Sequence, residues 1–243
     1  MRIRMVVEYD GSEFYGFQRQ PGLRTVDQEL EEALLRLTGE QVRVTGAGRT
    51  DAGVHALGQV VCFDTGASIP PVRFGQALNT CLPPDLRVIR SDEVPSDFHP
   101  RYHARSKTYR YLLYRSSSGY TFCRRYAHLH TGRLNLEVMR EAARCLRGEH
   151  DFRGFMASGS QVQNTVRTVY EFTVAESFPW MTFEVTANGF LYHMVRNLVG
   201  TLIEIGREAM PLEHLPAIIQ SGERSKAGPT APAQGLYLVR VEY

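Results

Sequence analysis

The residues best suited to chemistry lie in the segment 46–55, where Arg49 and Asp51 stand two positions apart. Alternating residues around Val44 and Val61 predict a strand on either side. Asp51 should therefore lie on a short connection, where a side chain can be presented to a reactant. A carboxylate beside a cation stays ionised at neutral pH and can act as a nucleophile, base or ligand. An ordinary loop ion pair, which would contribute little to stability, is an alternative that the spacing leaves open.

Metal and cofactor sites are not predicted. The pair Gly46 and Gly48 lacks the third glycine, the lysine and the helix start of a nucleotide-binding loop. The cysteines are far apart and form no Cys-x-x-Cys pair, which argues against zinc and against a disulfide framework. The cluster Glu149-His150-Asp151 is typical of a loop. We therefore expect no metal, no cofactor and in particular no nucleotide cofactor.

A second charged residue stands out because the helix predicted over 191–205 is strongly apolar and contains Arg196. Burying an unpaired guanidinium costs several kcal/mol, on the order of the penalty for any unmatched buried ion. If Arg196 is buried, a carboxylate must face it, and Asp51 is a candidate. If Arg196 lies at the polar edge of the helix, it needs no partner. The periodicity leaves both options open.

The basic residues are unevenly distributed, although the formal net charge is only +2. The segment 98–136 contains no Asp or Glu. Its cations are interleaved with aromatic residues, namely Arg101, Arg105, Lys107, Arg110, Arg115, Arg124, Arg125 and Arg133 among Phe98, Tyr102, Tyr109, Tyr111, Tyr114, Tyr120, Phe122 and Tyr126. A solvated basic face over core tyrosines is one interpretation. Guanidinium groups also neutralise phosphates and rings stack on unpaired bases, so RNA is the favoured partner.

Composition and length predict a globular protein without membrane association. The chain has 243 residues, 43% of them hydrophobic, and no apolar run long enough to span a bilayer. It begins directly with a strand pattern instead of the apolar stretch of a signal peptide. We expect a cytoplasmic protein.

The predicted elements alternate in a regular order. In the first half we expect strands at 3–9, around Val44 and Val61, and at 86–90, with helices over 25–37 and from 70 to before Pro83. In the second half we expect strands at 108–114, 167–174, 180–186 and 235–239, and helices over 136–146, 191–205 and after Pro211. The patterns predict an α+β fold of two tandem βαββαβ (ferredoxin-like) units, joined into one broad, mainly antiparallel sheet with helices on a face.

Two subdomains follow from this division, with an active-site cleft expected between the halves. Residues 1–97 should form an N-terminal α/β subdomain that carries Asp51. Residues 98–243 should form a C-terminal α/β subdomain with the basic aromatic block and the helix that bears Arg196.

Several motifs together resemble the TruA family of tRNA pseudouridine synthases. The blocks are spread over essentially the whole chain in the family's order. They are Glu8–Gly11 with Tyr15–Gln20, Gly48–His55, Phe98–Arg101, Lys107–Tyr111, Thr165–Thr168, Phe190–Asn197 and Gly235–Leu238. Phe17 departs from the pattern, since many relatives have tryptophan there, but it keeps an aromatic core position.

The resemblance implies a function and a role for each matching residue. A bacterial member isomerises uridine to pseudouridine at positions 38, 39 and 40 of the tRNA anticodon stem-loop, without a cofactor and as a homodimer. Asp51 would be the nucleophile, attacking either the sugar or the base, and Arg196 its basic partner. Tyr109 would stack on the target uracil, hold it after detachment and move a proton.

The remaining roles implied by the resemblance concern RNA. Arg49 and Arg101 would help to flip the target base out. The tRNA would be contacted by two segments, Phe98-His99-Pro100-Arg101-Tyr102 and Gly159-Ser160-Gln161-Val162-Gln163. The second segment carries no charge, whereas relatives can have basic residues there.

Two alternatives stay open. A related synthase could act at other tRNA or RNA positions, although the compact chain favours the bacterial type. An RNA-binding or RNA-folding module without catalysis would also explain the basic aromatic block. Such a module has no reason to keep Asp51, Arg49, Tyr109 and Arg196 together.

Overall fold

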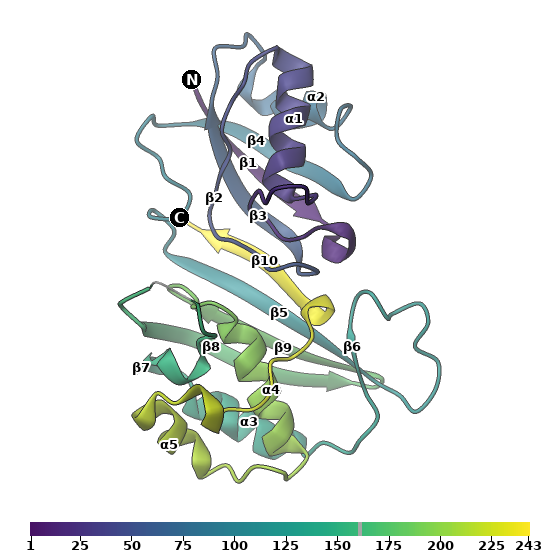
Figure 1. The fold of residues 1–243 in the computed structure, drawn as a ribbon, viewed down its shortest axis with the longest axis vertical. Helices are drawn as coiled ribbons and strands as arrows, with labels where there is room; N and C mark the ends of the chain where they lie inside the picture. The colour runs from purple at the N-terminus through teal and green to yellow at the C-terminus, as the bar shows by residue number, and fades with distance from the viewer. Residues whose placement is uncertain (160–161) are drawn as a thin grey trace. The chain divides into compact units, whose positions relative to one another are not determined.

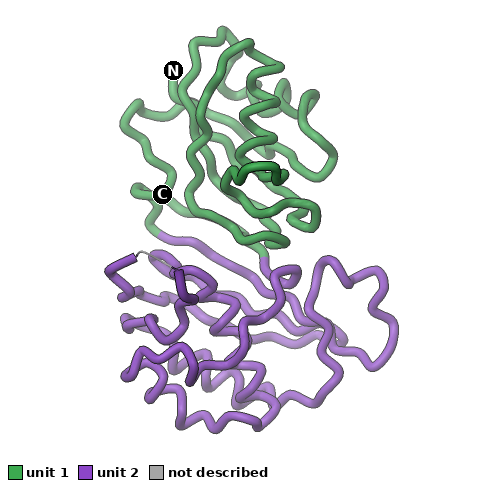
Figure 2. Tube along the Cα trace, viewed as in Figure 1, with its two compact units in different colours: residues 1–105, 237–243 green, residues 106–236 purple. Residues whose placement is uncertain are grey.

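The computed structural model describes residues 1–159 and 162–243. The chain divides into two compact units, residues 1–105 with 237–243 and residues 106–236, coloured separately in Figure 2. The elements of each are labelled in Figure 1. Among the described residues no helix combines the length and apolar character that a bilayer crossing requires.

The first unit is a mainly antiparallel sheet covered by two helices (Figure 1). Its strands run in the order β4 (Leu86–Val94), β1 (Arg2–Tyr9), β3 (His55–Asp64) and β10 (Leu236–Glu242), with the short β2 (Thr45–Gly46) paired to β3. β1 is antiparallel to both of its neighbours, and β10 runs parallel to β3. β1 alternates so that Ile3, Met5 and Val7 are fully buried.

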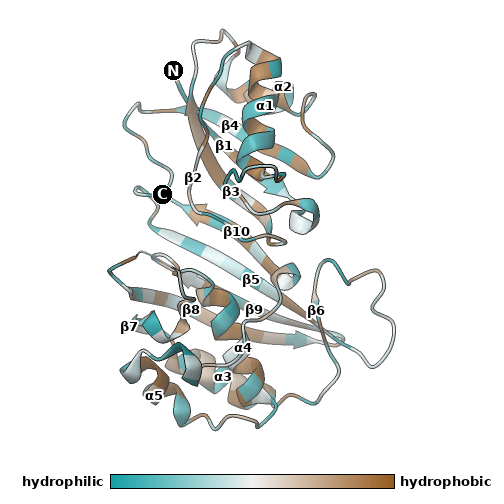
Figure 3. Ribbon diagram, in the orientation of Figure 1, coloured by the Kyte–Doolittle hydropathy of each residue, from teal (hydrophilic) through white to brown (hydrophobic). Residues whose placement is uncertain are grey.

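Helix α1 (Val26–Thr38) packs by an apolar stripe, as its sequence predicts. Its buried apolar residues are Val26, Leu30, Ala33 and Leu34, and both hydrophobic and hydrophilic colours appear along it in Figure 3. Thr25 is the N-cap residue, but its hydroxyl accepts no capping hydrogen bond from the helix N–H groups and donates to the Asp27 carboxylate, 2.8 Å away. The helix ends at Gly39, whose φ of 74° is left-handed and suits glycine. α2 (Phe74–Leu78) follows a 3₁₀ turn at Pro71–Arg73.

The second unit is also antiparallel for the most part. Its strands follow the order β5 (Ser106–Arg115), β9 (Trp180–Ala187), β8 (Val166–Ser177) and β7 (Gly148–Asp151), with β6 (His128–His130) running parallel beside β5. Its helices are α3 (Leu136–Cys145), α4 (Met194–Gly206) and α5 (His214–Ser221). Further 3₁₀ turns along the chain lie at Gly11–Glu13, Phe152–Phe155, Arg224–Lys226 and Ala233–Gly235.

The predicted α+β class with mainly antiparallel strands is confirmed. The first half has the predicted order β1, α1, β2, β3, α2, β4. Three predicted elements differ from their expected bounds. The strand predicted around Val44 is the short β2, and residues 42–44 lie outside it, where the Val44 N–H donates to the Glu31 carboxylate of α1. The helix predicted from Pro70 begins as a 3₁₀ turn at Pro71–Arg73, and its α-helical part is the five-residue α2. The helix predicted from Leu191 begins at Met194, because His193 before it is left-handed, with φ of 58°.

The division between the units differs from the predicted boundary at 97/98. Residues 98–105 and the last strand belong to the first unit because their contacts lie there. Arg2 donates to the Phe98 carbonyl over 2.9 Å, and the Tyr243 hydroxyl donates to the Pro100 carbonyl over 2.8 Å. The Arg105 N–H donates to the Glu242 carbonyl.

Candidate active site

Asp51 lies where the sequence predicts it, on the connection between β2 and β3. A tight turn follows it, in which the Val54 N–H donates to the Asp51 carbonyl over 3.1 Å. Gly53 has a φ of 77° in this turn, a conformation that glycine adopts without steric cost. Asp51 is half-buried and Arg49 is exposed. The segment thus presents one carboxylate and one guanidinium from a fixed backbone.

A neighbouring segment, residues 11–17, holds this connection in place. The Phe17 N–H donates to the Thr50 carbonyl over 3.1 Å, and the Gly53 N–H donates to the Phe14 carbonyl over 3.2 Å. Gly16 has a φ of 91°, and a Cβ atom there would lie 2.6 Å from the Thr50 carbonyl oxygen. The two segments therefore meet backbone to backbone.

His55 has a structural environment. Its ring is buried and stacks on Tyr237 at 4.7 Å between centroids. Its Nδ1 accepts the Gly11 N–H over 3.0 Å and lies 3.3 Å from the Asp10 carboxylate. Through this hydrogen bond, His55 joins the end of the Asp51 connection to residues 10–11.

Tyr109 lies on β5 in the second unit, opposite Val185 of β9. Its ring is 8% exposed and meets Phe190 edge-to-face, with centroids 5.0 Å apart and planes at 84°. This is a favourable aromatic geometry that fixes the plane of the tyrosine ring.

Arg196 belongs to the first turn of α4 and is half-buried, which lies between the two options left open by its periodicity. Its Nε donates to the Ala231 carbonyl over 2.7 Å, and the Ala231 N–H donates to the Arg196 carbonyl over 3.1 Å. The positive charge of Arg196 also reaches β5. Burial raises the pKa of the Tyr111 phenol well above its usual value, and the Arg196 charge partly counteracts that rise.

The residues that follow Arg196 in α4 explain why the Ala231 carbonyl stays within hydrogen-bonding distance of the Arg196 guanidinium. Asn197 is fully buried, donates to the Phe155 carbonyl, and accepts from Arg224 and Thr230 over 2.9 and 2.6 Å. Gly200 packs so closely that a Cβ atom there would lie 1.7 Å from the Pro229 carbonyl oxygen. The chain near Ala231 is therefore tied to α4 over several residues.

The predicted RNA segment 98–102 divides into inward and outward residues. Phe98 and Pro100 are buried, and the Phe98 ring lies 5.0 Å from that of Tyr243. Arg101 and Tyr102 are exposed, and the backbone N–H groups of both donate to His99 Nδ1. Burial, aided by the charge of His103, lowers the pKa of His99. Only part of this segment thus faces solvent.

The second predicted RNA segment is described incompletely. Gly159, Val162 and Gln163 are exposed, while Ser160 and Gln161 lie outside the described residues.

The fold gives part of the basic block acidic partners that the local sequence does not contain. Arg110 pairs with Glu184 of β9 at 2.7 Å, and Arg115 pairs with Glu176 of β8. In the segment 116–127, Phe122 is 93% exposed, and Arg124, Arg125 and Tyr126 are exposed as well. The exposed cations and rings of the block are therefore found in this segment, whereas the cations of β5 named here are paired with acids of neighbouring strands.

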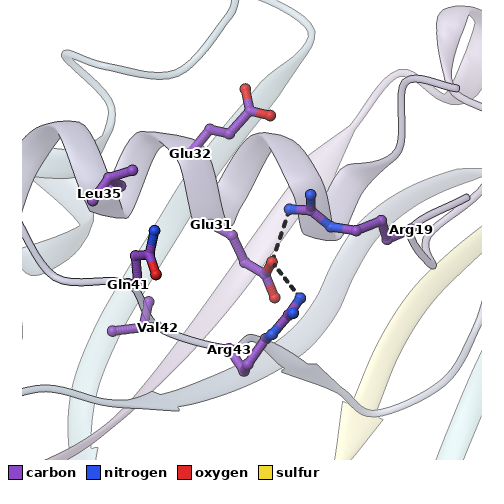
Figure 4. A pocket seen from close by; sticks show the side chains of 7 residues that line it. All are labelled: Arg19, Glu31, Glu32, Leu35, Gln41, Val42 and Arg43. Carbon is purple, nitrogen blue, oxygen red and sulfur yellow. Dashed lines mark hydrogen bonds and ion pairs between the residues drawn. The ribbon is translucent and has the colours of Figure 1, made fainter. Parts of the chain in front are cut away.

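A hollow in the surface of the first unit lies on α1 and the residues after it (Figure 4). Glu31 occupies its centre and accepts from Arg19 over 2.9 Å and from Arg43 over 3.3 Å. None of the predicted site residues that the structure describes lines this hollow. Among the described residues there is also no cluster of His, Cys, Asp and Glu that could hold a metal ion.

The sequence does not indicate the residues that hold the Asp51 connection in the first unit and Arg196 in the second. Phe14 and Phe17 act through their backbone groups, and Ala231 acts through its carbonyl, so their residue types carry no signal of these roles. Tyr9, Thr50 and Gln59 are buried polar residues, at the end of β1, on the connection and within β3. Their burial can be recognised only once the register of β1 and β3 is known.

Comparison with known proteins gives one consistent result. A family model described as tRNA pseudouridine synthase matches residues 5–103 and 142–243. The protein named tRNA pseudouridine synthase A of Moorella thermoacetica is 49% identical over 243 residues, covering 99% of each chain. The proteins of the same name from Syntrophomonas wolfei and Streptococcus mutans are 48% and 45% identical to this chain. The matched regions cover 97% and 99% of those two proteins.

Similarity to solved structures is weaker. The crystal structure of the archaeal box H/ACA sRNP Nop10-Cbf5 complex matches with a TM-score of 0.37 and 12% identity, over 98% of this chain and 46% of that chain. A match at this level carries no argument about the site.

Proposed function

The chain belongs to the tRNA pseudouridine synthase family, and we therefore propose that it isomerises uridines 38, 39 and 40 of the tRNA anticodon stem-loop, with Asp51 as nucleophile. The observation that carries the proposal is the similarity to proteins named tRNA pseudouridine synthase A, over nearly the whole length of those proteins. The half-buried position of Asp51 on a tight, backbone-tied turn supports it, because a nucleophile must be held in position and still be reachable.

The reaction moves one bond and needs no external reactant. The bond between N1 of uracil and C1′ of ribose breaks, C5 of the base bonds to C1′, the proton on C5 leaves, and N1 gains a proton. Electrons balance without a redox partner. Asp51 takes part covalently, either at C1′ of the sugar or at the base, and splits one difficult step into two easier ones.

The target base must first leave its stack, which costs a few kcal/mol. Arg49 and Arg101 are both exposed and present guanidinium groups that can bind phosphate or take the place of the extruded base. Tyr109 then supplies a flat aromatic face for the uracil. Its ring plane is fixed by Phe190, which suits stacking on one base in one orientation.

Arg196 acts in the proposal as the cation that keeps Asp51 ionised. Its bond to the Ala231 carbonyl supports this role because it orients the guanidinium through Nε. Tyr109 has a second role, which is to hold the detached uracil while it turns and to move a proton to or from it.

The tRNA is bound through exposed cations and rings. Arg101 and Tyr102 contact the RNA directly, while Phe98, His99 and Pro100 hold their turn. The segment 159–163 forms a further contact. The segment 116–127 adds Phe122, whose exposed ring suits stacking on an unpaired base.

The protein is proposed to act in the cytoplasm as a homodimer, with each tRNA held by both subunits. This follows from the resemblance to bacterial members of the family. Light scattering on the purified protein, with and without tRNA, measures the mass directly, and a monomer at working concentrations in both samples would remove this part of the proposal.

The experiment that tests the target positions is a map of pseudouridine in a tRNA transcript with uridines at 38, 39 and 40. Carbodiimide treatment followed by reverse transcription locates each pseudouridine. We expect stops at these positions with the native protein and none with Asp51→Ala. Modification elsewhere in the tRNA would mean a synthase with another target set, and binding without modification would mean an RNA-binding module.

A further inference from the structure

Three buried polar side chains of the first unit contact the connection that carries Arg49 and Asp51. Tyr9, Thr50 and Gln59 are 4%, 6% and 0% exposed. They come from the last residue of β1, from the connection itself and from the middle of β3. A polar group this deeply buried destabilises the folded state unless it is hydrogen-bonded. The hydrogen-bond partners of the three side chains therefore indicate their role.

Their partners are the backbone and side chain of the residues on either side of Arg49. The Tyr9 hydroxyl lies 2.7 Å from the Thr50 hydroxyl. Gln59 donates from Nε2 to the Gly48 carbonyl over 2.8 Å. Burial raises the pKa of Tyr9 to about 12, against the effect of hydrogen bonds with Thr50 and Gln59, so the phenol keeps its proton at neutral pH. The three residues form one connected group.

The group fixes two successive points of the connection. Gly48 precedes Arg49, and Thr50 lies between Arg49 and Asp51. The Thr50 carbonyl is held separately by the Phe17 N–H, so both the side chain and the backbone of Thr50 are fixed. A shift of Thr50 would move the two neighbouring side chains together.

We propose that Tyr9, Thr50 and Gln59 are positioning residues that set the placement of Arg49 and Asp51 for the isomerisation. The inference rests on the proposed function of that site. The group does not need to touch RNA. It acts by holding the carboxylate in attacking position, where a displacement of about 1 Å can cost about 100-fold in rate.

If these residues act only by positioning, their removal should change the rate of the chemical step without changing the affinity for RNA. Removal of the Tyr9 hydroxyl leaves the Thr50 hydroxyl buried without its partner and loosens the connection. The rate under single-turnover conditions should then fall, while the affinity for tRNA, which depends on exposed cations and rings, should stay close to native.

The test uses the full chain and a tRNA transcript labelled with tritium at C5 of uridine, at saturating enzyme. The variants are Tyr9→Phe, Thr50→Val, Thr50→Ser and the double variant of the first two. The matched control is Ser91→Ala. Ser91 is also buried in the first unit, and its hydroxyl donates to the Pro71 carbonyl over 2.7 Å and accepts the Gly75 N–H over 2.9 Å.

We expect Tyr9→Phe and Thr50→Val to lower the single-turnover rate by about 10- to 100-fold, with tRNA binding unchanged. Thr50→Ser should restore most of the rate because it keeps the hydroxyl. The double variant should be no slower than the slower single variant, since both remove the same bond. Native rates in Tyr9→Phe, or an equal loss of rate in Ser91→Ala, would overturn the proposal.

A second readout on the same variants does not depend on activity. Amide hydrogen exchange of Gly53 and Val54 reports the order of the connection, because both N–H groups are hydrogen-bonded there. We expect faster exchange in Tyr9→Phe and native exchange in Ser91→Ala. If the native protein releases no tritium, the proposed function fails, and exchange alone decides the positioning role. Unchanged exchange in Tyr9→Phe would then refute that role.

Discussion

Among single residues, the proposed chemistry depends on how one carboxylate and one guanidinium are held on a short connection. The sequence predicts the connection because glycines and alternating strand patterns surround Asp51. It does not predict what fixes the connection, since the Phe17 N–H and the Thr50 carbonyl are common to all residue types. Backbone contacts between segments distant in sequence depend on the register of β1 and β3, which no local pattern contains.

The close approach at Gly16 gives a prediction for a single substitution. Gly16→Ala places a Cβ atom at a φ of 91° and 2.6 Å from the Thr50 carbonyl oxygen. The left-handed conformation costs about 1–2 kcal/mol and overpacking costs about 1–3 kcal/mol. We expect the free energy of unfolding to fall by most of the sum of these two costs, as measured by urea unfolding followed by circular dichroism. The rate of tritium release should fall as well.

Gly22→Ala is the matched control for this substitution. Its φ is 72°, but no atom lies within 4 Å of the added carbon. It should lose only the conformational part, about 1–2 kcal/mol, and keep native activity. Equal losses of stability and activity in the two variants would show that the contact with Thr50 has no effect.

For the helices and strands, sequence periodicity predicts the long elements well and the short ones poorly. β8 and β9 and helix α1 lie close to their predicted places because each has many residues of one pattern. β6 and β7 have three and four residues, too few for any period to appear, and they form by pairing with β5 and β8. The late start of α4 has a different cause, because His193 before it has a left-handed φ of 58°, which the apolar periodicity of the segment does not reveal.

The packing of α4 gives a prediction in which helix propensity points the wrong way. Alanine is favoured over glycine inside a helix by about 1 kcal/mol. In Gly200→Ala, however, the added carbon would meet the Pro229 carbonyl oxygen at 1.7 Å. We expect a net loss of stability of about 1–3 kcal/mol and reduced activity, because Ala231 moves away from Arg196.

Gly206→Ala, in the same helix, tests whether the backbone contact is the cause. There the nearest atoms to the added carbon are side-chain atoms, the Sδ and Cγ of the fully buried Met139. This variant should lose stability in thermal unfolding through overpacking but keep native activity, because the 229–231 segment is not displaced. Gly200→Ala matching Gly206→Ala in activity would mean that the 229–231 segment adapts freely and does not orient Arg196.

Over the molecule as a whole, the basic residues matter more by their distribution than by their number. The formal net charge is +2, and Arg110 and Arg115 are paired with glutamates of neighbouring strands. Arg101 and Arg124 are exposed. The sequence predicts the basic block, but acids remote in sequence decide which of its cations are neutralised, so the outward part of the block emerges only from the fold.

This distribution predicts how tRNA binding responds to salt. Removing one cation that binds a phosphate should reduce the slope of log K against log salt by about 0.7 on single-stranded RNA. We expect Arg101→Gln combined with Arg124→Gln to weaken binding and lower the slope by about 1.4 in fluorescence anisotropy titrations. Arg144→Gln removes an exposed cation of α3 that pairs with Glu141, and should leave the slope unchanged. A flat response in the native protein would contradict RNA binding through these cations.

The role of Asp51 is tested most sharply by tritium release from C5-labelled tRNA, with the native protein compared with Asp51→Asn. Asparagine keeps the shape of aspartate but cannot act as the carboxylate nucleophile. We predict release by the native protein and none above background by Asp51→Asn, while a gel-shift assay shows that both bind the tRNA. Release by Asp51→Asn at a rate comparable to the native protein would contradict nucleophilic catalysis by this residue.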